Sequence, residues 1–142
     1  MLVTLLSTLL FLTFLVLGGF HFYWLFGGKW GLKQVIPTKE KTATALGVPP
    51  LATLIVALGL TLFGSLYLLK TGLLNLSFSP LALAFAYWFI PSIFLLRAIG
   101  EFNYVGLFKK IKHTDFAKAD SRIFVPLCLS IGLSGMAIQL LS

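Results

Sequence analysis

Hydrophobic residues along this chain fall into four long stretches that carry almost no charge. The stretches cover about residues 2–26, 51–69, 80–98 and 123–141. As helices rising about 1.5 Å per residue, they approach or exceed the roughly 30 Å of a bilayer's hydrocarbon core. The pattern therefore predicts an all-α integral membrane four-helix bundle, formed by residues 1–142 as a single transmembrane domain.

The composition favours a membrane protein over a soluble one. Hydrophobic residues make up 58% of the chain, charged residues 11%, and the mean hydropathy is +1.00. This is too little charge to cover a water-exposed surface. The only cysteine, Cys128, excludes an intramolecular disulfide and any Cys-x-x-Cys redox or zinc motif, and we expect no metal and no cofactor.

The positive charge lies almost entirely on one side of the predicted membrane. Four spans place linkers 27–50 and 99–122 on one side, and the 71–79 turn with both termini on the other. Ten of the eleven basic residues lie in or beside these two linkers, and only Lys70 lies opposite. The positive-inside rule predicts cytoplasmic linkers and extracytoplasmic termini in the cell membrane, the inner membrane if the source is bacterial. Anionic lipid headgroups, not nucleic acid, are the expected partner of the net charge of +7.

The segment from Arg97 to Arg122 holds most of the chain's charged chemistry, with six basic residues and three of the four acids. If the third helix continues to Tyr104, then Arg97, Glu101 and Tyr104 share one face, and Arg97 and Glu101 are placed to form an ion pair. His21 ends the first span at the same depth. Such a set fits proton transfer with His21 or Glu101 as the catalytic group, or a network that ties helices together. We favour the structural role because no nucleophile, metal set or cofactor motif accompanies the set.

Aromatic side chains suggest two further ligand contacts. Trp24 stands in an aromatic belt at the end of the first span, where such rings settle at headgroup level, and Trp30 is a second interfacial anchor. Pro91 cannot donate to the carbonyl of Tyr87 and predicts a kink, close to Trp88. Aromatic packing explains this region, and a lipophilic ligand is the alternative.

Small residues and short connections predict how the helices pack. The short 71–79 turn predicts that the second and third spans are antiparallel neighbours. Close helix crossings are expected at Gly59 and Gly64 and at Ser130 and Ser134.

The polar linker before the fourth span has the pattern of an interfacial segment. Its apolar side chains are expected in the headgroup region, namely Phe108, Ile111 and Phe116. Its lysines are expected to meet anionic lipid, namely Lys109, Lys110, Lys112 and Lys118. Asp120 or Ser121 is expected to cap the fourth helix.

Several motifs together resemble a known family. They are HFYW from His21 with the following GGKWG, RAIGEFNYVGLFK from Arg97, FAKAD from Phe116, and PLC from Pro126. The chain resembles small multi-pass bacterial membrane proteins grouped as domain of unknown function 3995. The resemblance implies the four-span fold and brings no activity with it.

The leading functional hypothesis is a bundle that binds or carries a lipophilic or amphipathic small molecule near the cytoplasmic leaflet. The candidate ligand-binding residues are His21, Trp24, Tyr87, Trp88, Arg97, Glu101 and Tyr104. One alternative is an intramembrane enzyme acting on a lipid, quinone or isoprenoid by acid–base chemistry. Another is a structural subunit that packs against a membrane-protein partner or a second copy.

Overall fold

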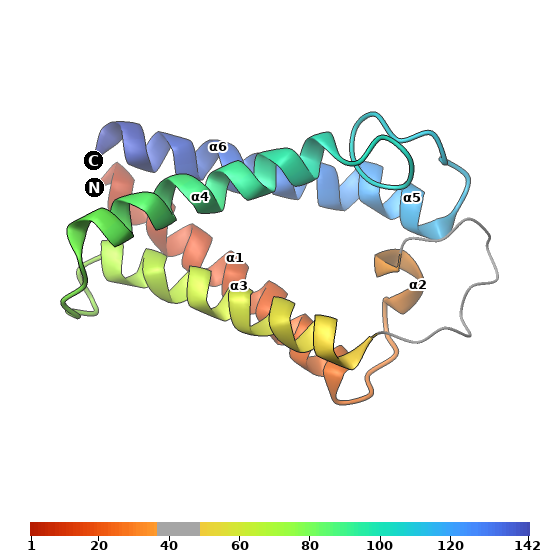
Figure 1. Cartoon of the computed structure of the whole chain (residues 1–142), viewed down its shortest axis with the longest axis horizontal. Helices are drawn as coiled ribbons and strands as arrows, with labels where there is room; N and C mark the ends of the chain where they lie inside the picture. Colours follow the sequence, from red (N-terminus) through yellow and green to blue (C-terminus); the bar gives the residue numbers. More distant parts are fainter. Residues whose placement is uncertain (37–48) are drawn as a thin grey trace.

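Four long helices make up most of the protein (Figure 1). The structure is a computed structural model and describes residues 1–36 and 49–142. Helices α1 (Leu2–Leu25), α3 (Pro50–Lys70) and α4 (Pro80–Ile99) and the segment Asp115–Leu141 are each long and apolar enough to cross a membrane. Neither described range contains a β-strand. The predicted all-helical fold with four membrane-length helices is confirmed.

The fourth span begins earlier than the sequence suggested. Helix α5 (Asp115–Ala119) runs into a π-helical turn, η2 (Asp120–Phe124), and then into α6 (Val125–Leu141). The first turn is capped by Thr114, whose side-chain oxygen accepts a hydrogen bond from the backbone of Ala117 at 3.0 Å. The predicted caps, Asp120 and Ser121, are wrong because the helix has already started before them.

The first linker is described only in part. It contains the four-residue helix α2 (Leu32–Val35), which contacts α5 of the other linker. Lys39 and Lys41, two of the basic residues counted in this linker for the orientation, lie outside the described residues.

The four long helices associate as two pairs. Helix α1 packs along α3, α4 packs along α6, and a smaller contact between α1 and α6 joins the pairs. We call these the α1–α3 pair and the α4–α6 pair. Both termini lie at one end of the molecule, the terminal end, and α2, α5 and the 100–114 connection lie at the other, the polar end (Figure 1). The pairs diverge from the terminal end toward the polar end (Figure 1).

The expected neighbours α3 and α4 touch through aromatic rings, with Phe63 and Phe94 6.4 Å apart in the core and a second contact near the terminal end, but each packs mainly against another helix. In the second contact the rings of Tyr67 and Tyr87 lie 5.7 Å apart, and the Tyr87 hydroxyl donates to the carbonyl of Leu66 at 2.7 Å. The close pairings occur elsewhere because glycines allow them. A Cβ at Gly64 would lie 3.2 Å from Phe14 of α1.

Small residues mark the α4–α6 contact as well, although not all the expected ones. A Cβ built at Gly135 would lie 2.8 Å from Pro91 of α4, so α6 approaches α4 closely here. Gly64 is thus confirmed as a packing position. A Cβ built at Gly59 would meet nothing within 4 Å, and Ser130 is exposed with its hydroxyl bonded to the carbonyl of Pro126. The packing roles predicted for Gly59 and Ser130 are wrong.

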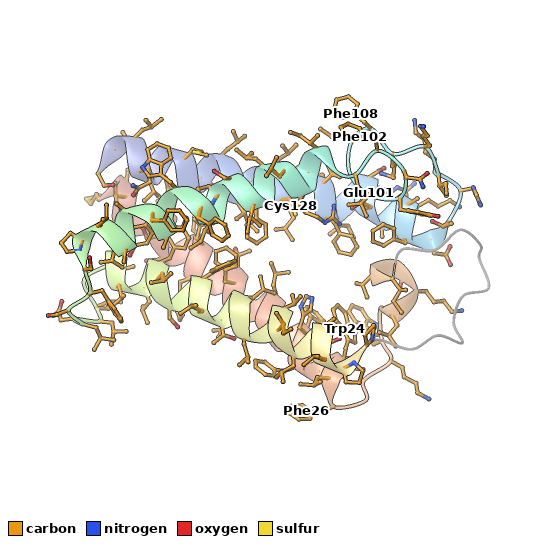
Figure 2. All side chains as sticks on the ribbon, viewed as in Figure 1. Trp24, Phe26, Glu101, Phe102, Phe108 and Cys128 are labelled. Carbon is orange, nitrogen blue, oxygen red and sulfur yellow. The ribbon has the colours of Figure 1, made fainter. Side chains whose placement is uncertain are left out.

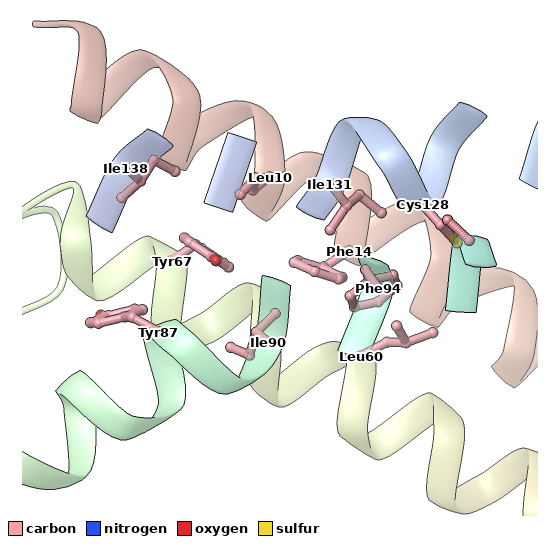
Figure 3. Packing of buried hydrophobic residues seen from close by; sticks show 11 residues of the cluster. Leu10, Phe14, Leu60, Tyr67, Tyr87, Ile90, Phe94, Cys128, Ile131 and Ile138 are labelled. Atoms are coloured by element: carbon pink, nitrogen blue, oxygen red, sulfur yellow. The ribbon is translucent and has the colours of Figure 1, made fainter. Parts of the chain in front are cut away.

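The hydrophobic core lies where the two pairs meet (Figure 3). Phe14 of α1 is fully buried, stacks on Tyr67 with ring centres 5.9 Å apart, and lies 5.3 Å from the ring of Phe94. Ile90 and Ile138 are also fully buried in this cluster. Toward the polar end, polar side chains replace these rings between the helices.

Candidate functional site at the polar end

Asp120 is the centre of a buried group of charges. Its side chain is fully buried, and its Oδ1 accepts a hydrogen bond from Arg97 Nη2 at 2.8 Å. The other oxygen, Oδ2, accepts from the backbone N–H of Gly106 at 2.8 Å and from Lys109 Nζ at 3.2 Å. We call Arg97, Lys109 and Asp120 the charge cluster. It joins the end of α4, the following loop and the start of the fourth span.

Lys109 is fully engaged within this cluster. Its side chain is 3% exposed, and its ammonium also donates to the carbonyl of Gly106 at 3.1 Å and to the hydroxyl of Ser121 at 2.6 Å. An ammonium has three donors, and Asp120, Gly106 and Ser121 use all of them. Lys109 is therefore a structural cation. The prediction that it meets lipid headgroups is wrong.

Arg97 differs from Lys109 because part of its guanidinium has no partner. Its side chain is 31% exposed. Nη2 bonds to Asp120, whereas Nη1 is buried and has no hydrogen-bond partner among residues 1–36 and 49–142. The charge cluster contains two cations and one anion. It thus has a net charge of +1 and an unused donor on Arg97.

A glycine-bounded loop, residues 100–106, builds this site. Helix α4 ends at Ile99, and Gly100 and Gly106 both have positive φ, 87° and 94°. A Cβ on either glycine would overlap the backbone of the other side of the loop. The backbone N–H of Leu107 returns to the carbonyl of Ala98 at 2.9 Å. This crossing places the Gly106 N–H against Asp120.

The predicted ion pair between Arg97 and Glu101 is not formed. The helix does not continue to Tyr104, because the positive φ of Gly100 ends it. Glu101 instead accepts hydrogen bonds within the glycine loop, from the backbone N–H groups of Tyr104 and Val105. Glu101 is exposed, and Tyr104 is half-buried in the same loop. Both therefore support the loop that positions Gly106.

His21 lies at the polar end but on the other helix pair. Its Nδ1 is 2.8 Å from the carbonyl of Leu17, so Nδ1 carries the hydrogen and Nε2 is the acceptor of the neutral ring. The ring is half-buried and meets Trp24 edge-on at 5.1 Å. In the part of the chain that the structure describes, no hydrogen bond or ion pair joins His21 to Arg97 or Glu101.

Trp24 holds the turn that follows α1. Its indole nitrogen donates to the carbonyl of Trp30 at 2.8 Å. Figure 2 places Trp24 on the α1–α3 pair and Cys128 on the α4–α6 pair. Cys128 is buried in the core cluster.

Tyr87 and Trp88 lie away from the charge cluster and point in different directions. Tyr87 is buried near the terminal end, with the ammonium of Lys70 4.2 Å from its ring centre. Lys70 also donates to Gln139 at 2.7 Å. Trp88 is 44% exposed on the outer surface of the bundle. Helix α4 runs through Pro91 as one helix.

The interfacial segment is only partly as predicted. Phe108 is exposed and pairs with exposed Phe102, their ring centres 6.2 Å apart, on the outer side of the loop (Figure 2). Phe116 is buried instead and packs against Phe124 at 6.3 Å. The helical turn that starts at Asp115 turns Phe116 inward, which the linker prediction did not anticipate.

Sequence reasoning missed Asp120 and Lys109 as parts of the site. The available signal was an acid directly before an apolar span, since ionisable groups at the membrane boundary normally have a partner. Across residues 1–36 and 49–142, no group of three or more His, Cys, Asp or Glu side chains is arranged to hold a metal ion.

The whole site falls within a region that matches a protein family. No curated protein and no solved structure matches this chain. A family model matches residues 14–134, which include α1 from Phe14, the glycine loop and the charge cluster. The chain therefore belongs to the family described as "Protein of unknown function (DUF3995)".

Proposed function

We propose that this protein binds an amphipathic small molecule with an anionic head at its polar end, in the cytoplasmic leaflet of the cell membrane. The observation that carries the proposal is the unpartnered Nη1 of Arg97 beside a buried cluster with a net charge of +1. A carboxylate, phosphate or sulfate head would supply both the missing acceptor and the missing negative charge.

The energetic argument concerns burial of charge. An ion in a low-dielectric site is costly unless it is paired and hydrogen-bonded, by several kcal/mol per ion after relaxation. Asp120 offsets one cation, and Lys109 is fully satisfied by its three acceptors. The uncompensated charge thus resides on Arg97, whose side chain remains 31% exposed. Arg97 is therefore the residue of the cluster that an anionic ligand would approach.

The apolar part of the ligand would lie between the two helix pairs. On α1, the Phe14 ring meets Phe94 of α4 across the two pairs, and His21 lies about two helical turns further toward the polar end. On the other pair, Cys128 belongs to the buried stripe of α6. The pairs diverge in this region (Figure 1). His21, Trp24 and Cys128 are therefore the proposed contacts of the apolar part.

The experiment is native mass spectrometry of protein extracted gently from its own membrane. Wild type should carry a bound species. Arg97→Lys should lose it, because lysine can keep the ion pair with Asp120 but does not present two terminal nitrogens in a planar fork. Arg122→Lys, at an exposed position of η2, is the matched control and should retain the species.

Two results would overturn the binding proposal. One is a wild-type protein that carries no ligand beyond bulk phospholipid. The other is equal ligand occupancy in wild type and Arg97→Lys, once thermal unfolding has shown that both are folded.

Acid–base chemistry on the bound molecule is a second candidate function, favoured by the tautomer of His21. With Nδ1 bound to Leu17, Nε2 is the basic nitrogen of the ring. In D₂O, wild type should exchange a carbon-bound proton of the ligand for deuterium, and His21→Gln should not. Equal incorporation in the two proteins, or none in wild type, would eliminate the catalytic role.

A further inference from the structure

The turn after α1 folds back and places Trp30 on the outer face of that helix. The Trp30 ring stacks on Phe20 with ring centres 5.8 Å apart. Its carbonyl accepts from the Trp24 indole at 2.8 Å, and its backbone N–H donates to the Tyr23 hydroxyl at 3.3 Å. Three contacts to α1 therefore fix the position of Trp30, although its side chain is 71% exposed.

This arrangement encloses an open groove of about 440 Å³ on the outside of the bundle. The groove is lined by Val16, Gly19, Phe20, Tyr23 and Trp30. Gly19 leaves its floor open, since a Cβ built there meets nothing within 4 Å. Val16 is 57% exposed, so no other described helix covers this face. We call this feature the Trp30 groove.

Two lysines lie close in sequence to Trp30, which lines the groove. Lys29 directly precedes Trp30, and Lys33 follows it by about one helical turn in α2. Both side chains are exposed. Neither lysine forms an ion pair with any acid of the two described ranges, Glu101, Asp115 and Asp120. An apolar groove thus lies next to positive charge that has no described counter-charge.

We propose that the Trp30 groove holds one acyl chain of an anionic phospholipid, whose phosphate binds Lys29 and Lys33. The groove spans the last turns of a membrane-length helix, where lipid is the surrounding solvent. Aromatic rings at a helix end mark the headgroup level, and lysines there attract anionic headgroups. The combination selects a phospholipid over a neutral apolar molecule. The site is on the outer face of α1 and is separate from the proposed site between the helix pairs.

The groove can be filled without disturbing the fold. Gly19→Leu should place a side chain in the space that the acyl chain occupies, and nothing within 4 Å opposes its Cβ. Gly59→Leu is the matched control, because Gly59 is also an internal helix glycine with nothing within 4 Å of its Cβ. Both substitutions change helix propensity in the same direction.

The measurement uses protein reconstituted in vesicles of equal phosphatidylglycerol and phosphatidylcholine, with a photoreactive acyl chain on the phosphatidylglycerol. In wild type and Gly59→Leu, crosslinks should map to the residues that line the groove, Val16, Gly19, Phe20, Tyr23 and Trp30. In Gly19→Leu the crosslink yield there should fall severalfold, because the leucine side chain occupies the space that the acyl chain fills in wild type. The same experiment is repeated with the photoreactive acyl chain on phosphatidylcholine. Wild type should be labelled more by phosphatidylglycerol than by phosphatidylcholine, and the double variant Lys29→Gln/Lys33→Gln should be labelled equally by the two lipids.

Three results would overturn this proposal. One is a crosslink pattern in which the groove residues are not labelled above the rest of the four spans. Another is an equal loss of yield in Gly59→Leu and Gly19→Leu. The third is a protein–protein crosslink through Trp30 that disappears in Gly19→Leu, which would assign the groove to a second copy of the chain. Arg97→Lys should leave the crosslinks to the groove residues unchanged. The ligand between the helix pairs is proposed to contact other residues, His21, Trp24 and Cys128, so the two proposals can fail independently.

Discussion

Asp120 shows how much can depend on one side chain in a chain with only four acids. It is fully buried and has three hydrogen-bonded donors, from Arg97, Gly106 and Lys109. Arg97 belongs to α4, whereas Gly106 and Lys109 belong to the 100–114 connection. Removing the carboxylate would leave two cations near each other without their counter-charge, and breaking a buried pair is far more costly than omitting it.

We predict that Asp120→Asn lowers the free energy of unfolding by about 3–5 kcal/mol, because Lys109 and Arg97 lose their shared anion. The measurement is unfolding in mixed micelles by SDS titration, followed by tryptophan fluorescence. Asp115→Asn is the control. Asp115 lies in the first turn of α5 and has no described ion pair, so its loss should cost about 0.3–1 kcal/mol. Comparable stability of Asp120→Asn and wild type would contradict the role assigned to the charge cluster.

At the scale of elements, the glycine loop decides what α4 can reach. Gly100 ends the helix with a φ of 87°. Gly106, with a φ of 94°, lies at the point where the loop returns and passes the backbone of Gly100. The backbones come so close that neither position has room for a Cβ. Two separate requirements, positive φ and absence of a side chain, therefore act at each glycine.

Gly106→Ala should destabilise the protein by more than the conformational cost alone. Gly72, in the turn after α3, has a φ of 80° but nothing within 4 Å of its Cβ. Gly72→Ala should therefore cost only about 1–2 kcal/mol, the penalty of a left-handed conformation. Gly106→Ala adds a steric overlap and withdraws the N–H from Asp120. SDS titration of both variants tests this, and equal losses would show that the loop can relax around a methyl group.

The π-helical turn η2 begins at the residue on which the cluster depends. Asp120 is its first residue, and the apolar span follows it directly. Such turns often occur at functional sites within longer helices. Here the turn lies where a five-residue polar helix changes into a seventeen-residue membrane segment.

For the molecule as a whole, the arrangement in two pairs explains why both linkers matter. The pairs share a core around Phe14, midway along α1, and the α2–α5 contact reconnects them at the polar end. The proposed ligand lies between these two connections. The proposed cytoplasmic location of the polar end rests on the charge count of the linkers.

Cysteine labelling tests this orientation. Cys128 is buried and can first be replaced by alanine. In intact cells, a membrane-impermeant maleimide should label Leu73→Cys, in the exposed turn of the terminal end, and should label Lys110→Cys only after permeabilisation. The reverse labelling pattern would place the charge cluster and the proposed ligand in the outer leaflet.

The sequence by itself determined the four helices, their common polar end and the family. These features follow from the local density of apolar residues, and a helix can satisfy its backbone in lipid without a distant partner. Gly64 was also recognisable, because small residues signal close packing in any membrane helix.

Only the tertiary structure decided which helices pair and which charges meet. Spacing suggested Glu101 as the partner of Arg97, yet two glycines end α4 and bring Asp120 to the guanidinium from 23 residues away. The burial of Lys109 and the groove beside Trp30 depend on the same kind of chain reversal. Such reversals are set by backbone conformations of single glycines and turns, which hydrophobic patterning does not encode.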